Sequence, residues 1–160
     1  MRPSTTTVLL LALGVPGTAR GQTRDMNSIR AVAVDSQWVK YDPTSRTVTF
    51  PLVAGAPGSS SGPFNFNGYT GGGATLTVPG GSKVVINFVN RDGTPHSALV
   101  IPGDGPLPTI PGDPAIPAAY TRSVTQGLAQ EDKDDIRFTA PDSGKYRIVC
   151  GVPGHALSGM

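Results

Sequence analysis

KVVINFVN, residues Lys83–Asn90, decides the fold class of this 160-residue chain. Side chains along an extended strand alternate between its two faces, so Val84, Ile86 and Phe88 share one face. The opposite face is more polar, as in a strand that is buried on one side only. The segment therefore predicts a β-strand that packs one face on a hydrophobic core.

Further short segments with strand character lie on both sides of this strand. They are rich in β-branched and aromatic residues, and turn-forming residues cluster between them. The 21 Gly and 16 Pro residues leave little room for long helices. The predicted strands are residues 37–41 (QWVKY), 47–53 (TVTFPLV), 64–69 (FNFNGY), 74–78 (ATLTV), 96–101 (HSALVI), 135–139 (DIRFT) and 145–150 (KYRIVC), with 120–125 left open as a strand or short helix.

Seven to nine short strands separated by turns are typical of an all-β protein. The pattern predicts an antiparallel Greek-key β-sandwich or barrel. Residues 102–117 hold six prolines and three glycines, so they are expected to form a long surface connection. Because no repeat or long linker interrupts the pattern, residues 35–160 are expected to form a single domain.

The N-terminus has the features of a secretory signal peptide. Arg2 precedes a compact apolar core at residues 7–15 (TVLLLALGV), and small residues follow at the positions that a signal peptidase reads. We expect residues 1–21 to be the signal, with cleavage before Gln22, and residues 22–34 to be irregular. The protein would then be exported to the periplasm or the extracellular space. An uncleaved membrane anchor is the alternative, although the apolar run is short for a bilayer span.

The charge balance gives no basis for nucleic-acid binding. The formal net charge of the whole chain is +2. Removal of Arg2 and Arg20 with the signal would leave 11 basic residues against 11 acidic ones. A neutral mature chain lacks the positive charge by which proteins bind a phosphate backbone.

The only cysteine lies in a C-terminal motif with metal-ligand spacing. In CGVPGHALSGM, Cys150, His155 and Met160 follow a C-x4-H-x4-M pattern, and the only other histidine is His96. A thiolate, two imidazoles and a thioether suit copper, because Cu(I) prefers soft sulfur and Cu(II) accepts imidazole. Blue-copper proteins transfer electrons with this His2Cys set and a weak axial Met. These four residues are therefore the predicted metal ligands.

A zinc site, a catalytic cysteine and simple burial are the alternatives for these residues. Zinc accepts Cys and His ligands, but a thioether does not suit it. His155 could activate Cys150 as a catalytic nucleophile, but no acid or amide that would orient the histidine is evident. A lone buried Cys or His is more often structural. Burial alone, however, gives no reason for the grouping of the single Cys, both His and a Met at ligand spacing.

Four motifs, FNFNGY, KVVINFVN, PHS and CGVPGHALSGM, resemble the cupredoxins of the sulfocyanin group. The ligand-loop spacing is also rusticyanin-like, and the resemblance covers residues 35–160. It implies a cupredoxin-type β-sandwich with one mononuclear type 1 (blue) copper. It further implies that both imidazoles, of His96 and His155, bind through Nδ1, that Cys150 binds as thiolate, and that Met160 is the axial ligand.

The resemblance also implies roles for two neighbouring residues. Ser97 is expected to donate a hydrogen bond to the Cys150 sulfur, and Asn90 is expected to tie the two ligand loops together. The implied function is one-electron transport outside the cytoplasm, not enzymatic catalysis. The implied partners are redox proteins such as cytochromes or a terminal oxidase, which would make transient contacts with a monomer.

Docking is expected around the His155 ring, at an apolar rim formed by Val152, Pro153, Ala156 and Leu157. Two alternatives stay open at this point. One is a copper-binding or copper-delivery protein without electron transfer. The other is a red or green copper site, in which the coordination differs from that of a blue site.

Overall fold

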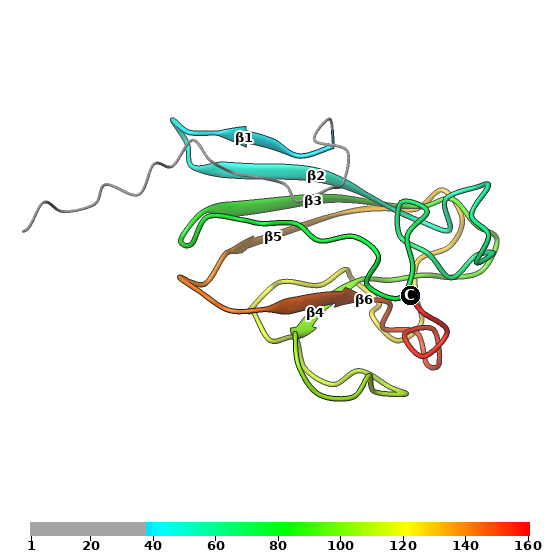
Figure 1. The fold of residues 1–160 in the computed structure, drawn as a ribbon. Coiled ribbons are helices and arrows are strands. Elements are labelled where there is room, and N and C mark those ends of the chain that lie inside the picture. Colours follow the sequence, from blue (N-terminus) through cyan, green and yellow to red (C-terminus); the bar gives the residue numbers. More distant parts are fainter. Residues whose placement is uncertain (1–37) are drawn as a thin grey trace, which may run out of the picture.

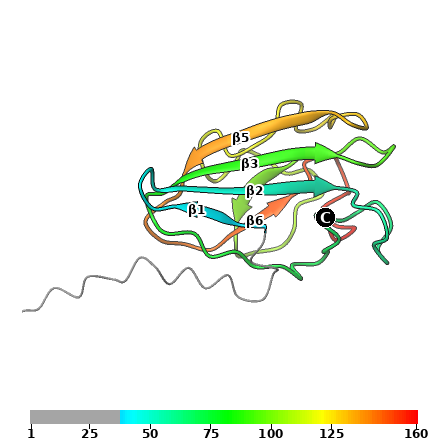
Figure 2. The same ribbon diagram turned by 90° about the horizontal axis from the view of Figure 1, so that it is seen from above.

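The computed structural model describes residues 38–160 as a two-layered β-sandwich (Figure 1). The larger layer is a four-stranded sheet in the order β1-β2-β3-β5, seen from above in Figure 2, and the smaller layer is the pair β4-β6. This confirms the all-β sandwich. The strands are β1 (Lys40–Asp42), β2 (Thr47–Ala54), β3 (Lys83–Asn90), β4 (Leu99–Pro102), β5 (Lys133–Thr139) and β6 (Tyr146–Val149).

The centre of the core lies on β2 and β3, whose inward residues are in register. Phe50 pairs with Ile86 and Leu52 with Phe88 across the two strands, and all four are at most 5% exposed. β5 extends this surface through Ile136, which lies opposite Ile86. Alternate residues of β3 are buried, which confirms the face predicted from KVVINFVN.

The β2–β3 pair is parallel, which differs from the antiparallel pairing of the predicted Greek-key sandwich. Parallel neighbours need a long crossover, and residues 55–82 supply it by returning the chain to the start of the sheet. As a consequence, the C-terminal ends of β2 and β3, at Ala54 and Asn90, lie side by side at the same end of the sheet.

Two predicted strands, residues 64–69 and 74–78, are loops, and β4 starts only at Leu99, three residues after the predicted start. The alternation in FNFNGY has a different cause from strand pairing. The Asn67 side chain accepts a hydrogen bond from Val53 N and donates one to Pro51 O, so the side chain itself bonds to the β2 backbone. Residues 120–125 make one isolated bridge, between Tyr120 and Leu99.

The loops that carry the predicted ligands gather at one end of the sandwich. β2, β3 and β6 finish at this end, and β4 begins there. The C-terminal segment, red in Figure 1, lies beside the loop at residues 55–71. Thr70 Oγ1 donates to Gly159 O at 2.8 Å, which joins these two loops.

Residues 1–37 lie outside the described part of the chain. The predicted signal peptide (1–21), its cleavage before Gln22, and the irregular segment 22–34 fall in that part and stay predictions. Among residues 38–160, no helix has the length and apolar character needed to cross a membrane.

Candidate metal centre

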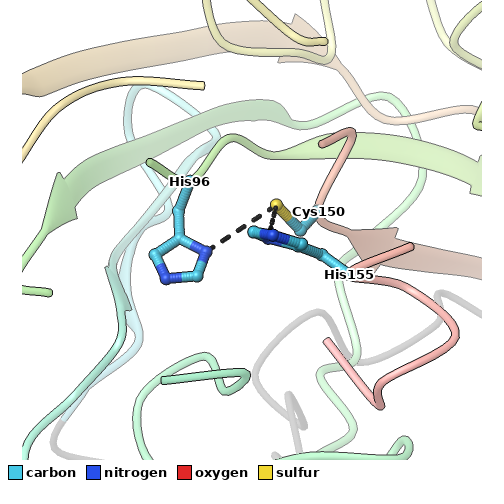
Figure 3. Close-up of side chains that lie close together, drawn as sticks. All are labelled: His96, Cys150 and His155. Carbon is cyan, nitrogen blue, oxygen red and sulfur yellow. Dashed lines mark hydrogen bonds between the residues drawn. The ribbon is translucent and has the colours of Figure 1, made fainter. Parts of the chain in front are cut away.

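Three of the four predicted ligands meet at the loop end of the sandwich (Figure 3). Cys150 Sγ lies 3.4 Å from His155 Nδ1 and 3.9 Å from His96 Nδ1. One donor atom from each residue lies within 4.8 Å of the other two. Metal–ligand bonds of about 2.0–2.3 Å place ligand atoms roughly 3.5–4.5 Å apart, so the spacing suits a single ion.

Cys150 follows β6 directly and is fully buried. Its backbone N donates to Met160 O at 2.9 Å, which pins the end of the ligand loop to its start. Strict alternation along the predicted strand 145–150 would put Tyr146, Ile148 and Cys150 on one inward face. Tyr146 is 40% exposed, however, so β6 turns inward only toward its C-terminal end.

His96 is held by backbone pairing with a distant segment. Its N donates to Leu128 O at 3.1 Å, and its O accepts from Leu128 N at 2.7 Å. Gly127 makes this close approach possible, because a Cβ there would lie 2.9 Å from His96 N and its φ is +75°. The His96 ring is thereby fully buried with Nδ1 turned toward the sulfur (Figure 3).

Asn90 ends β3 and organises the turn that leads to His96. Its buried Nδ2 donates to Thr94 O at 2.8 Å and to Leu128 O at 2.9 Å, and its Oδ1 accepts from Asp92 N at 2.9 Å. The expected role of Asn90 therefore needs correction. These bonds join the His96 turn to the segment at Leu128, and none of them reaches the loop that carries Cys150.

Ser97 makes the connection between the two ligand loops. Its backbone N donates to Cys150 Sγ at 3.4 Å, and its hydroxyl lies 3.8 Å from the same sulfur. The hydroxyl also accepts from Gly151 N at 2.9 Å and donates to Val124 O at 2.6 Å. A hydrogen bond from Ser97 to the sulfur was expected, and the main chain is the closer donor.

Residues 151–160 fold into consecutive tight turns that return His155 and Met160 to Cys150. His155 N donates to Val152 O, and Met160 N donates to His155 O, each at 3.1 Å. Met160 is 4% exposed and packs in the same core cluster as Cys150. The turns thus bring the Met160 backbone to the cysteine, and its side chain lies in the adjoining core.

The FNFNGY motif contributes Phe64, a site residue that was not identified from the sequence. Its ring packs edge-on against His155, with centroids 4.9 Å apart, and against His96 at 6.4 Å. Fully buried Asn65 shapes the loop, accepting from Ala56 N and Gly68 N and donating to Gly62 O. The alternation of Phe and Asn in this motif was the sequence signal that could have pointed to Phe64. In the structure this motif forms a loop that covers the imidazoles.

Phe64→Ala is expected to raise the pKa of His155 in the copper-free protein. Burial lowers the pKa of His155 from its ordinary value of 6.5, and the Phe64 ring packs directly on the imidazole. Removing the ring admits water that stabilises the charged form. An NMR titration of the imidazole protons measures the shift, with Phe64→Leu as the control that keeps most of the cover. An unchanged pKa in Phe64→Ala would contradict this role.

The surroundings of the His96, Cys150 and His155 side chains favour their uncharged forms in the copper-free protein. Burial lowers the pKa of His96 to about 4, with a smaller contribution from neighbouring His155. Burial raises the pKa of the Cys150 thiol, although hydrogen bonds from Ser97 act in the opposite direction. Neutral imidazoles are ready to bind a metal, whereas the thiol must first lose its proton. Copper affinity is therefore expected to fall as the pH falls.

The copper-free protein is expected to lose stability between pH 6.5 and pH 4. In this window unfolded chains protonate His96, whereas the folded state holds it neutral because its pKa is about 4. The unfolded state then binds more protons, so the free energy of unfolding decreases as the pH falls. The loss is on the order of 3 kcal/mol, from roughly 1.4 kcal/mol per pKa unit. Denaturant unfolding across this range measures it, and His96→Gln should flatten the slope.

The arrangement fits metal binding better than cysteine catalysis or simple burial. A thiol that is fully buried, with its pKa raised, is poorly placed to act as a nucleophile. Simple burial does not explain why both Nδ1 atoms turn toward one sulfur. One sulfur and two imidazole nitrogens form a compact donor set around a common point.

The sulfocyanin (SoxE) domain model matches residues 35–160. The chain belongs to the sulfocyanin family. It is 28% identical over 127 residues to sulfocyanin from Sulfolobus acidocaldarius, a match that covers 75% of this chain and 63% of that protein. This sulfocyanin-family chain therefore spans somewhat less than two thirds of the curated relative's length.

Solved structures of two other proteins, rusticyanin and auracyanin, resemble this fold. Rusticyanin from Thiobacillus ferrooxidans is 30% identical, with a TM-score of 0.53 over 78% of this chain and 84% of its own. Auracyanin from Roseiflexus castenholzii superposes with a TM-score of 0.50 over 70% of this chain and 90% of its own. At 23% identity the auracyanin match speaks for the fold alone. Both likenesses place the sandwich among the cupredoxins.

Cupredoxins bind one type 1 copper ion, and the donor atoms of this sulfocyanin-family chain fit that ion. A type 1 copper ion would be held by two imidazole nitrogens and a thiolate. His96, Cys150 and His155 supply this set from a buried, prearranged cluster. Cupredoxin homologues are electron-transfer proteins, and this chain has the donor atoms to hold the metal that such proteins use.

Proposed function

We propose that this chain is an extracytoplasmic one-electron carrier. His96, Cys150 and His155 would hold a mononuclear type 1 copper ion, with Met160 as the axial ligand. The observation that carries the proposal is the cluster of one sulfur and one ring nitrogen from each histidine, all within 4.8 Å of one another. Copper bound there would supply a centre that gains and loses one electron.

The protein's own contribution is to hold the donor atoms still. Cys150 is tied through its backbone to Met160, and His96 is tied to Leu128. Ser97 links the two loops through Gly151 N and the cysteine sulfur. Ligands that are fixed before the metal changes oxidation state need little rearrangement, and a mixed sulfur and nitrogen set serves both Cu(I) and Cu(II).

The proposed route for electrons leads through the edge of the His155 ring. His155 is only partly buried, whereas His96 and Cys150 are fully buried. Exposed apolar residues near it are Leu157, at 55% exposure, and Pro153. Ala156, which was predicted to belong to this rim, is 1% exposed and lies in the core.

The proline-rich connection at residues 103–117 extends the same surface. Gly154 N donates to Thr109 O at 2.9 Å, and neighbouring Ile110 is 61% exposed. This small apolar surface would suit brief docking of redox proteins such as cytochromes or a terminal oxidase to a monomer. Electron-transfer encounters bury little area and dissociate quickly.

A copper titration followed by absorption spectroscopy tests the proposal. We expect an intense blue thiolate-to-copper band at one copper per chain that bleaches on one-electron reduction. Met160→Leu should keep this band and change the reduction potential, as expected when only an axial ligand is lost. Copper binding without such a band, with rapid metal exchange, would favour the copper-delivery alternative and overturn the electron-carrier function.

A further inference from the structure

One buried atom of the site lacks the partner that its chemistry requires. His96 Nε2 is fully buried and makes no hydrogen bond with any residue of the described range 38–160. The other ring nitrogen, Nδ1, faces Cys150 Sγ. A neutral imidazole carries its proton on one nitrogen only, so a ring that offers the Nδ1 lone pair carries the proton on Nε2.

Asp92 places a carboxylate opposite this nitrogen. Its Oδ1 lies 3.7 Å from His96 Nε2, which is longer than a hydrogen bond but within ion-pair distance. The Asp92 side chain is 32% exposed, whereas the imidazole is fully buried, so the charge acts on the ring partly through the protein interior. Oδ1 also accepts from Thr94 N at 2.7 Å, which fixes its position.

The parallel strand pair brings this carboxylate to the site. β2 and β3 end side by side, and Arg91 N donates to Ala54 O at 2.9 Å just beyond β3. Gly55 then passes directly against Asp92, because a Cβ on Gly55 would lie 2.3 Å from Asp92 Cβ. Gly55 also has φ +61°, so both the backbone conformation and the close approach to Asp92 require a residue without a side chain.

We propose that Asp92 is a positioning residue for His96. Its carboxylate attracts the Nε2 proton, which selects the tautomer whose Nδ1 lone pair points toward Cys150 and restrains the ring. The same negative charge favours Cu(II) over Cu(I), because Cu(II) carries the larger positive charge. Only this second effect rests on the proposed copper function, whereas the selection of the tautomer holds in the copper-free chain as well.

Asp92→Asn in the copper-free protein tests the choice of tautomer. Asn keeps the shape and the oxygen that accepts from Thr94 N, so the turn stays folded, but it removes the charge. Nitrogen NMR shifts at pH 7 report which ring nitrogen of His96 carries the proton. We expect the Nε2-protonated form to dominate in the native protein and its ratio to the other form to fall on the order of fivefold in Asp92→Asn. An unchanged ratio would overturn the proposal.

The copper-loaded protein tests the second effect with a matched control. Asp92→Asn should shift the preference for Cu(II) over Cu(I) about tenfold toward Cu(I), which the one-electron relation converts to about 59 mV in the reduction potential. Asp132→Asn removes a charge from the turn before β5, where Asp132 pairs with Arg122. Among residues 38–160 the carboxylate within ion-pair distance of His96 is that of Asp92, so Asp132 serves as the control. We expect a clearly smaller shift there. Equal shifts of the reduction potential in the two variants would overturn a specific role for Asp92. A native protein that shows no blue band with copper would instead refute the proposed copper function and would not affect the tautomer result.

Discussion

Cys150→Ser is expected to abolish the thiolate-to-copper absorption band and to weaken copper binding more than about hundredfold. Loss of a partner that only orients a ligand costs roughly 10–100-fold in metal affinity, so loss of the sulfur ligand itself should cost more. Serine has a similar size but offers a hard, protonated oxygen in place of a soft thiolate. Absorption spectra and competitive copper titrations measure both changes.

The copper-free form of this variant separates a ligand role from a packing role. Cys150 is fully buried in the main core cluster, so a hydroxyl there should cost some stability. Val149→Ala, in the preceding core position, removes buried apolar volume without touching the donor atoms. We expect this control to lower the free energy of unfolding and to keep the blue band. A blue band that survives in Cys150→Ser would exclude the proposed copper site.

Asn90→Ala is expected to lower the free energy of unfolding of the copper-free protein by about 3 kcal/mol. The side chain is fully buried and makes three hydrogen bonds that hold the turn leading to His96. Truncation removes these bonds and leaves buried backbone groups without hydrogen-bond partners. Each such group lowers the stability by about 1–3 kcal/mol. Denaturant unfolding monitored by the fluorescence of Trp38 measures the change.

Asn87→Ala on the same strand is the matched control. Asn87 points to the exposed face and makes one hydrogen bond, to Asp135 at 2.9 Å. Its loss should cost less than about 1 kcal/mol, because exposed polar groups regain their hydrogen bonds from water. Copper affinity should fall in Asn90→Ala and stay unchanged in Asn87→Ala. Similar losses in the two variants would contradict the special role of the buried asparagine.

The sequence alone was sufficient to predict the fold class and to predict that Cys150, His96 and His155 contribute donor atoms to one site. KVVINFVN identified a strand with Val84, Ile86 and Phe88 on one face, and all three are at most 2% exposed. A two-residue period is a local property of an extended backbone, so it can be read without knowing the partners. The single cysteine and the two histidines could likewise be assigned to one metal site from their side-chain types, because copper binds only certain kinds of ligand.

Tertiary structure alone decided which segments became strands and how the donor atoms were oriented. FNFNGY has the alternation of a strand, yet Asn67 bonds to β2 and Phe64 covers two imidazoles. Strand pairing depends on a partner that local sequence does not name, and the parallel β2–β3 pair arises from a long crossover. The contact between Asp92 and His96 follows from that pairing, since it requires Gly55 at the neighbouring strand end. Residue types therefore determine which chemistry is available, and only the packing of distant segments determines where each atom points.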